Sequence, residues 1–279
     1  NMLMPRLSED EPGNYTDHFG DFILDKSKFN VYFDSNEPDF YAPYPMKMML
    51  EKAPHFDLIL TRRPELLKFP NARLFLFGTH WVADYQNAFE NKKNAISYAM
   101  TGKDSDARFN DLIAHGVQPA IGYHVRHQIG GNFENIQKVS NLQIDGYNSE
   151  RYPTSYGALK HTLSAADDGK LELMKYKFHI AVENSALPNY MTEKLHDCFM
   201  TKTVPIYFGC PNVSEYYNMD GILKFDTGED LVNILESLDD DSYDKMRDAV
   251  EDNHRRFLKI DDGGFQGKFW KAIEKEVNK

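Results

Sequence analysis

Apolar and polar residues alternate in short blocks along the chain, and the spacing switches between strand-like and helix-like. Residues 30–33, 56–60 and 73–77 are apolar runs typical of buried strands, and residues 44–53 have helical spacing. Residues 87–93 are polar and predict a linker. The pattern therefore predicts a small strand–helix–strand layer that ends before a second series begins.

The second series alternates strands and helices to the end of the chain. Strands are predicted at residues 94–100, 142–147, 178–182, 204–208 and 222–225. Helices are predicted at residues 120–129, 192–199, 230–238, 242–258 and 267–279. Residues 148–174 predict a loop, and Ser242 is expected to cap its helix. Such alternation predicts an α/β fold with a doubly wound parallel sheet.

The composition is that of a globular protein able to bury a core. The chain has 279 residues, which suits one large or two small domains; 41% are hydrophobic and 27% charged. Its net charge of −11 argues against nucleic-acid binding, which needs clustered Lys and Arg. The two cysteines, Cys198 and Cys210, are expected to be reduced apolar fillers.

The most informative stretch follows the strand predicted at residues 178–182. In a strand–loop–helix unit, the end of the strand and the start of the helix face the same edge of the sheet, where free N–H groups favour a phosphate. Glu193 can accept both hydroxyls of a ribose, and Lys194 is a point charge suited to a pyrophosphate. Taken alone, these two residues fit solvated surface charge better than a binding site.

The residues around Glu193 and Lys194 favour a binding site over solvated surface charge. The wider pattern reads ENS at 183–185, Y-x-TEK at 190–194, VPI at 204–206 and then Gly209. This string closely resembles the signature of the α1,3-fucosyltransferases, family 10 of the glycosyltransferases. The resemblance implies a GT-B-like fold of two Rossmann-like domains, with the donor site in the C-terminal one. Domains are expected at residues 1–92, on the acceptor side, and 93–279, whose last helix returns to the first domain.

The resemblance also implies which residues bind the donor. Arg126 falls at the family's phosphate-contacting arginine, and Lys103 lies in a turn that follows a predicted strand. The expected donor-binding residues are Arg126, Asn184, Tyr190, Thr192, Glu193 and Lys194, with Lys103 as a further candidate.

A catalytic base is expected from the N-terminal domain. The family has a Glu-Ser-Pro-like loop there, whereas this chain reads SNEP at residues 35–38 and lacks the residue between Glu and Pro. Glu37 is the first choice and Asp34 the second, and attack assisted by such a base would invert the anomeric carbon. A Glu before Pro in a turn is also often only a solvated charge.

No metal ion and no cofactor beyond the nucleotide-sugar co-substrate is expected. Asp167-Asp168 and residues 239–241 read as solvated turns rather than a metal-binding pair. His124 and His127 share a predicted helix, but the sequence places no third zinc ligand.

The resemblance implies an inverting glycosyltransferase that uses GDP-fucose, acting on an oligosaccharide or a glycoprotein glycan. Two alternatives stay open: another donor such as UDP-xylose, or a non-catalytic module that binds nucleotide or sugar. Tyr156, Lys160 and His161 either reach a ligand or are exposed linker residues.

Cellular location is predicted from what the chain lacks. No run of about 18 apolar residues predicts a spanning helix, and the first residues have no signal-peptide core. Animal members of the family are membrane-anchored, so a soluble bacterial or viral type in the cytoplasm is expected, or a chain from which an anchor has been removed.

Overall fold

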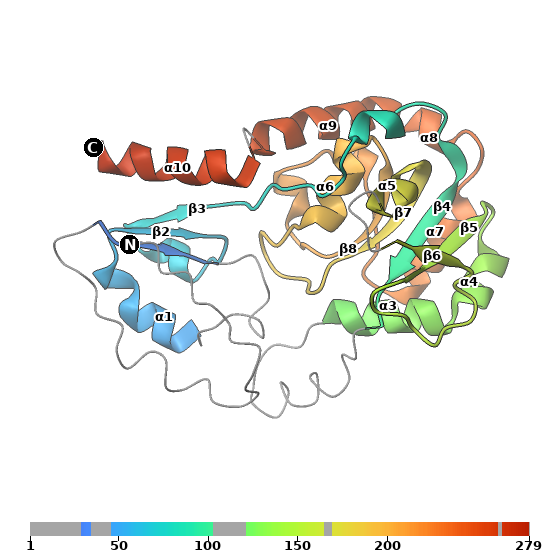
Figure 1. The fold of residues 1–279 in the computed structure, drawn as a ribbon, viewed down its shortest axis with the longest axis horizontal. Coiled ribbons are helices and arrows are strands. Elements are labelled where there is room, and N and C mark those ends of the chain that lie inside the picture. The colour runs from blue at the N-terminus through green and yellow to red at the C-terminus, as the bar shows by residue number, and fades with distance from the viewer. Residues whose placement is uncertain (1–28, 35–45, 103–120, 165–168, 262–263, 279) are drawn as a thin grey trace.

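The structure, a computed structural model, describes residues 29–34, 46–102, 121–164, 169–261 and 264–278. Within these ranges the chain forms two parallel sheets that follow one another in sequence (Figure 1).

The first sheet is small and has three strands in the order β1-β2-β3. They are β1 (Val31–Phe33), β2 (Leu58–Thr61) and β3 (Ala72–Leu74), and the helix α1 (Met46–Lys52) lies between the first two in sequence. Every residue of the central strand β2 is buried. Ile59 packs with Met49 of α1 on one face, whereas Leu58 and Leu60 belong to a second apolar cluster.

The second sheet has six parallel strands in the order β6-β5-β4-β7-β8-β9. They are β4 (Lys93–Met100), β5 (Ile144–Ser149), β6 (His161–Leu163), β7 (Tyr176–Val182), β8 (Val204–Phe208) and β9 (Leu223–Lys224). The helices are α3 (Ile121–Gly131), α4 (Phe133–Val139), α5 (Gly169–Met174), α6 (Glu193–Met200), α7 (Gly228–Ser237), α8 (Ser242–Lys245), α9 (Arg247–Asp261) and α10 (Gly264–Val277). The strand order runs outward from β4 and then outward from β7, as in a Rossmann sheet. The predicted class, α/β with two Rossmann-like units in a GT-B-like arrangement, is confirmed.

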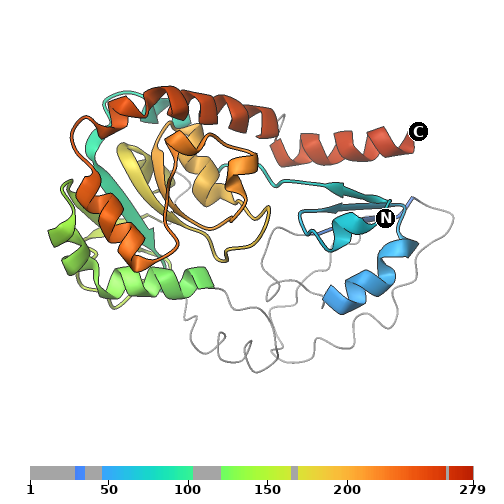
Figure 2. The ribbon, with the colours of Figure 1, turned by 180° about the vertical axis from the view of Figure 1, so that it is seen from behind.

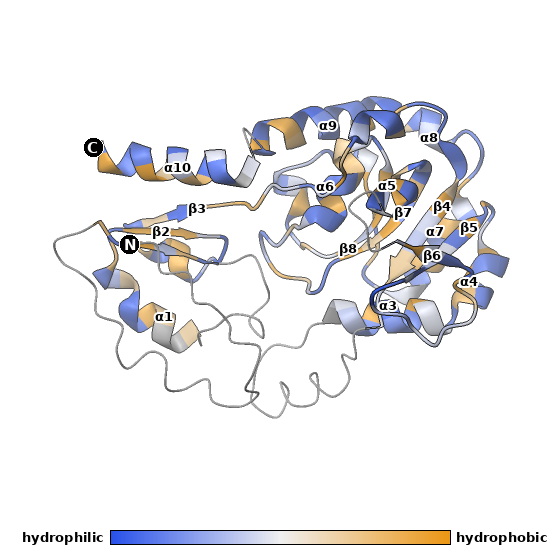
Figure 3. Cartoon of the chain, viewed as in Figure 1, coloured by the Kyte–Doolittle hydropathy of each residue, from blue (hydrophilic) through white to orange (hydrophobic). Residues whose placement is uncertain are grey.

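Both faces of the larger sheet are covered by helices. Alternate residues of β7 point to opposite sides, so that Phe178 and Ile180 pack with α3, α4 and α7, whereas Ala181 packs with α5 and α6. The central strands β4, β7 and β8 are accordingly buried along most of their length, and hydrophilic residues lie mainly on the outer helices (Figure 3). Within the residues described, no helix combines the length and the apolar character needed to span a bilayer.

The last helix, α10, leaves the larger unit and packs on the three-stranded sheet, as both views show (Figures 1 and 2). Phe269 of α10 is buried with Leu58, Leu60 and Phe75, and its ring meets Phe33 edge-on at 5.6 Å. The domain limits at residues 92 and 93 stay a prediction.

Three predicted segments differ from the structure. Residues 148–174 are not a loop throughout, because they contain β6 and α5. The side chains of β6 are partly or fully exposed, so this edge strand has no hydrophobic signal, and α5 is too short to show a helical period.

The helix expected at residues 242–258 is divided at Met246 into α8 and α9. Ser242 does not cap it: its hydroxyl donates to Asp239 Oδ1, and Asp241 is the residue before α8. The strand expected at residues 73–77 ends at Leu74, and the predicted linker packs on the larger unit through the buried Ala88.

Candidate functional site

The predicted donor-binding residues gather at the carboxyl edge of the larger sheet. The chain leaves β4 toward one side and β7 toward the other, and open α/β sheets bind ligands where neighbouring strands diverge in this way. Residues 183–192 lead from β7 to α6, so the free N–H groups at the start of α6 face the same edge.

Glu183, directly after β7, is fully buried and holds this loop. It accepts two hydrogen bonds from Thr192, from the backbone N–H at 2.8 Å and from the hydroxyl at 2.6 Å. Burial raises the pKa of Glu183, while the Lys194 ammonium 4.0 Å away and the Thr192 donors oppose that rise. Thr192 is also the N-cap of α6, because its side chain accepts from the Lys194 N–H. Glu183 therefore determines where α6 begins.

Glu193 and Lys194 form an ion pair at the start of α6. Lys194 Nζ lies 3.0 Å from Glu193 Oε1. Burial alone would raise the pKa of Glu193, but the ammonium groups of Lys194 and Lys170 outweigh it and lower the pKa to about 2. Burial would lower the pKa of Lys194, and the carboxylates of Glu193 and Glu183 reverse this, so the pKa is raised. Both residues are therefore charged at neutral pH.

Arg126 reaches the same place from α3. Its Nη2 donates to Asn184 Oδ1 at 2.7 Å and its Nη1 to the Val182 carbonyl at 2.8 Å, while the guanidinium lies 4.4 Å from the centroid of the Tyr123 ring. The charge of Arg126 also opposes the raised pKa of Lys194. The structure therefore brings these two cations, predicted from distant parts of the sequence, to one edge.

A glycine makes this approach of α3 possible. The Gly122 N–H donates to the Asn184 carbonyl at 3.1 Å, and a Cβ atom at Gly122 would lie 1.6 Å from the Glu183 carbonyl oxygen. Any larger residue would push α3, and Arg126 with it, away from the end of β7.

Tyr190 lies where the two units meet. Its ring is fully buried, and the Arg62 guanidinium at the end of β2 stands 4.9 Å from the ring centroid. Asn189, with a left-handed φ of 59°, donates its side-chain N–H to the Arg62 carbonyl at 2.8 Å. The loop before α6 is therefore held from both units.

The predicted catalytic residues are only partly visible. Glu37, like the donor-site candidate Lys103, lies outside the described residues. Asp34 is buried, and its carboxylate accepts from Arg63 Nε at 3.0 Å and from the Thr61 hydroxyl at 2.8 Å. Through these bonds Asp34 stabilises the carboxyl end of the small sheet.

No cluster of three or more His, Cys, Asp or Glu side chains suited to a metal ion occurs among the described residues. His124 lies 3.0 Å from the Gln128 amide, and His127 lies 2.9 Å from the Tyr156 hydroxyl. Metal independence stays a prediction.

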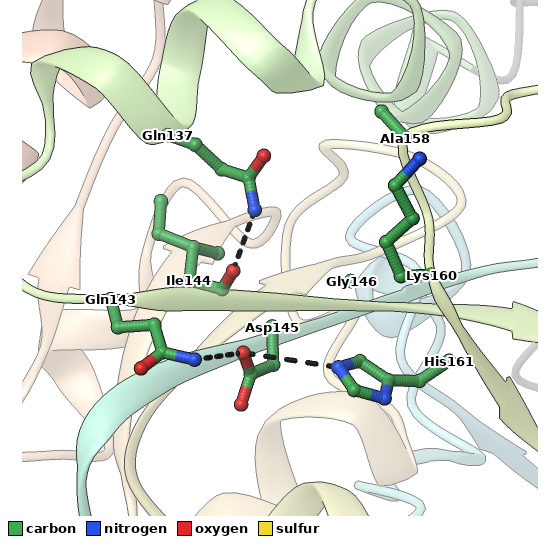
Figure 4. Close-up of a pocket in the computed structure, with 8 residues that line it drawn as sticks. All are labelled: Gln137, Gln143, Ile144, Asp145, Gly146, Ala158, Lys160 and His161. Carbon is green, nitrogen blue, oxygen red and sulfur yellow. Dashed lines mark hydrogen bonds and ion pairs between the residues drawn. The ribbon is translucent and has the colours of Figure 1, made fainter.

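A separate hollow of about 210 Å³ lies beside the first residues of β5, away from the donor-site residues (Figure 4). Lys160 and His161, which the sequence left open as ligand contacts, line it. Asp145 at its floor accepts from Tyr176 at 2.6 Å and from Gln143 at 2.6 Å. Its carboxylate is thus satisfied from within the protein.

Sequence reasoning missed four residues that shape the site. Gly122 and Arg62 have no local signal, and Lys170 lies in a segment predicted as loop. Glu183 enters the sequence analysis only as the first residue of the ENS string, although an acidic residue directly after an apolar strand could have marked it as a buried anchor.

Comparisons with known proteins address the same region. Residues 134–247 match the profile described as glycosyltransferase family 10 (fucosyltransferase), C-terminal part. This segment is therefore similar to the C-terminal part of the family 10 glycosyltransferases. The matched segment contains the loop and helix that hold Asn184, Glu193 and Lys194.

Similar proteins include the alpha-(1,3)-fucosyltransferase FucT of Helicobacter pylori, 32% identical over 102 residues, 36% of this chain and 21% of that protein. The alpha-(1,3)-fucosyltransferase B of Drosophila melanogaster is 38% identical over 173 residues, 57% of this chain and 39% of that protein. A crystal structure of an alpha1,3-fucosyltransferase with GDP aligns with a TM-score of 0.46 and 15% identity, covering 82% of this chain and 71% of that one. The chain thus spans only 21% and 39% of the lengths of these two curated relatives.

Proposed function

We propose that this chain is a glycosyltransferase that moves a sugar from a nucleotide-sugar donor, GDP-fucose being favoured, to a hydroxyl of a glycan acceptor. The observation that carries the proposal is the meeting of Arg126, Glu193 and Lys194 at the carboxyl edge of the larger sheet. Its family 10 segment and its similarity to α1,3-fucosyltransferases support the choice of donor.

Each of these residues has a part in the proposed reaction. Arg126 and Lys194 are fixed cations that stabilise the negative charge growing on the departing diphosphate. The Glu193 carboxylate accepts hydrogen bonds from the ribose hydroxyls of the donor. Asn184, fastened to Arg126 by its side-chain oxygen, contacts phosphate or sugar, and the buried Tyr190 holds the loop that presents them.

The acceptor hydroxyl needs a base on the opposite side of the sugar. Glu37 is proposed for this role, because both oxygens of the alternative, Asp34, already accept hydrogen bonds from Arg63. Attack opposite to the leaving diphosphate inverts the anomeric carbon in one displacement. Because two protein cations can neutralise the diphosphate, the proposal requires no metal ion.

Thermal unfolding with GDP, UDP and ADP, followed by donor turnover with GDP-fucose and UDP-xylose, tests the proposal. A ligand that binds only the folded chain raises the Tm, and GDP is expected to raise it most. Lys194→Ala should abolish that rise, whereas Lys175→Ala, which changes an exposed lysine, should keep it. If neither GDP nor UDP moves the Tm of the unaltered protein, the donor site is wrongly assigned.

The turnover arm separates the alternatives. Release of fucose or formation of a fucosylated glycan supports the proposal, and turnover of UDP-xylose alone would identify another donor. Nucleotide binding without turnover of any donor or acceptor mixture would identify a non-catalytic binding module. Glu37→Gln should retain GDP binding and lose transfer to an acceptor, which assigns the base.

A further inference from the structure

Lys170, the second residue of α5, joins three parts of the chain beside the proposed donor site. Its Nζ lies 2.9 Å from Asp197 Oδ2, 3.6 Å from Glu193 Oε1 and 4.5 Å from the centroid of the Trp81 ring. Lys170 belongs to the helix before β7, the two carboxylates to α6, and Trp81 to the connection between the sheets. One ammonium group therefore links these elements.

Asp197 holds Lys170 in this position. The Asp197 side chain is only 2% exposed, and its other oxygen accepts from the Trp81 N–H at 2.6 Å. Burial raises the pKa of Asp197, and the Lys170 ammonium opposes the rise. If Lys170 turned toward solvent, it would leave a carboxylate buried without its cation, which is costly. The ammonium is thus fixed by a residue that takes no part in donor binding.

From this position Lys170 acts on Glu193. Lys170 and Lys194 both contact Oε1 of Glu193, at 3.6 Å and 3.0 Å. Among the residues that the structure describes, no side chain donates a hydrogen bond to Oε2; besides the two lysines, only the backbone N–H of Glu193 itself contributes a hydrogen bond to this carboxylate. Two cations at one oxygen keep the carboxylate ionised and limit its rotation, so that the second oxygen can serve a ligand.

We propose that Lys170 is a positioning residue for nucleoside recognition: it holds the Glu193 carboxylate so that it accepts hydrogen bonds from both ribose hydroxyls. The inference rests on the proposed function, in which Glu193 meets the donor ribose. It follows that Lys170 sets the preference for a ribonucleotide over a deoxyribonucleotide, because only a correctly oriented carboxylate can use the 2′-hydroxyl.

Calorimetric titration of the whole chain with GDP and with 2′-deoxy-GDP tests this role. The unaltered protein is expected to bind GDP at least about tenfold more tightly, the loss expected for one hydrogen bond to a charged group. Lys170→Met keeps the apolar stem against Trp81 and removes the charge. The Lys170→Met substitution should reduce the ratio of the two Kd values to below about threefold, mainly by weakening the binding of GDP.

A second variant and two controls complete the design. Lys170→Gln retains a polar end and is measured beside Lys170→Met, with thermal unfolding to show that each is folded. Lys170→Arg should retain the ratio, and Lys175→Met, directly after the same helix, should leave it unchanged, since Lys175 pairs with the exposed Glu172. A purely structural Lys170 would lower the Tm and leave the ratio intact, which would overturn the inference alone. An unaltered protein that binds neither nucleotide would overturn the proposed function as well.

Discussion

The two edges of the six-stranded sheet carry buried charge in different ways. At the amino end of β5, Asp145 contacts Lys93, Tyr176 and Gln143, and each of these partners lies within the same unit. At the carboxyl edge, Glu193 is held by lysines at one oxygen and keeps 13% of its side chain exposed. The comparison shows that burial of a carboxylate does not by itself mark a ligand site: Asp145 is satisfied by protein partners, whereas Glu193, in the proposed donor site, keeps part of its side chain exposed.

The largest effect is expected from a substitution of Gly122, on the carboxyl edge of the sheet. Gly122→Ala would place a Cβ atom against the Glu183 carbonyl, so α3 must shift and take Arg126 with it. We expect GDP affinity to fall at least about tenfold and the free energy of unfolding to fall by about 1–3 kcal/mol. Calorimetric titration and chemical denaturation measure the two effects.

Gly228→Ala is the matched control, because a Cβ there meets no atom within 4 Å. It should change stability by less than about 0.5 kcal/mol. Unaltered GDP binding by a folded Gly122→Ala protein would show that α3 does not position the donor site.

At the amino edge, Asp145→Ala should lower stability without weakening GDP binding. It leaves the Tyr176 hydroxyl without its carboxylate partner, and we expect the free energy of unfolding to fall by about 2–3 kcal/mol. Because Lys93 is 46% exposed, its ammonium can return to water, which limits the loss. GDP affinity should stay within about twofold.

Denaturant unfolding and GDP titration of the same samples measure the stability and the GDP affinity of Asp145→Ala. Asp226→Ala removes an exposed ion pair with Lys224 and serves as the control, with an expected change below about 1 kcal/mol. A marked loss of GDP binding in Asp145→Ala without loss of stability would place a functional site at the amino edge.

The last prediction concerns Lys92, also at the amino edge, and the pH dependence of stability. Its ammonium donates to the Thr203 hydroxyl at 2.8 Å, and burial lowers its pKa to about 7 from the usual 10.5. Between these values the unfolded chain binds more protons than the folded one, so stability rises with pH. We expect the unaltered protein to gain up to about 1.4 kcal/mol per pH unit relative to Lys92→Met.

Chemical denaturation between pH 7 and 9 measures this slope, and Lys175→Met should parallel the unaltered protein throughout. Parallel curves for Lys92→Met and the unaltered protein would show that Lys92 does not titrate in this range.

Sequence reasoning reached the unit β7–α6–β8 and the place of Glu193 and Lys194 at the start of α6, because both depend on residues close together in the chain. The resemblance to family 10 added Arg126, which the structure places beside Asn184. The sequence did not predict α5, because its six residues are too few to show a helical period. Lys170, which lies in α5, was therefore not found. The roles of Glu37 and Lys103 stay predictions.

By itself the sequence determined the class of fold, the order of its main strands and helices and the resemblance of its C-terminal region to family 10, because periodicity and local motifs are properties of neighbouring residues. Only the tertiary structure decided that Glu183 would anchor α6, that Gly122 would admit α3, and that Lys170 would reach Glu193. Contacts of this kind join residues far apart in the chain, and their geometry depends on how whole elements pack.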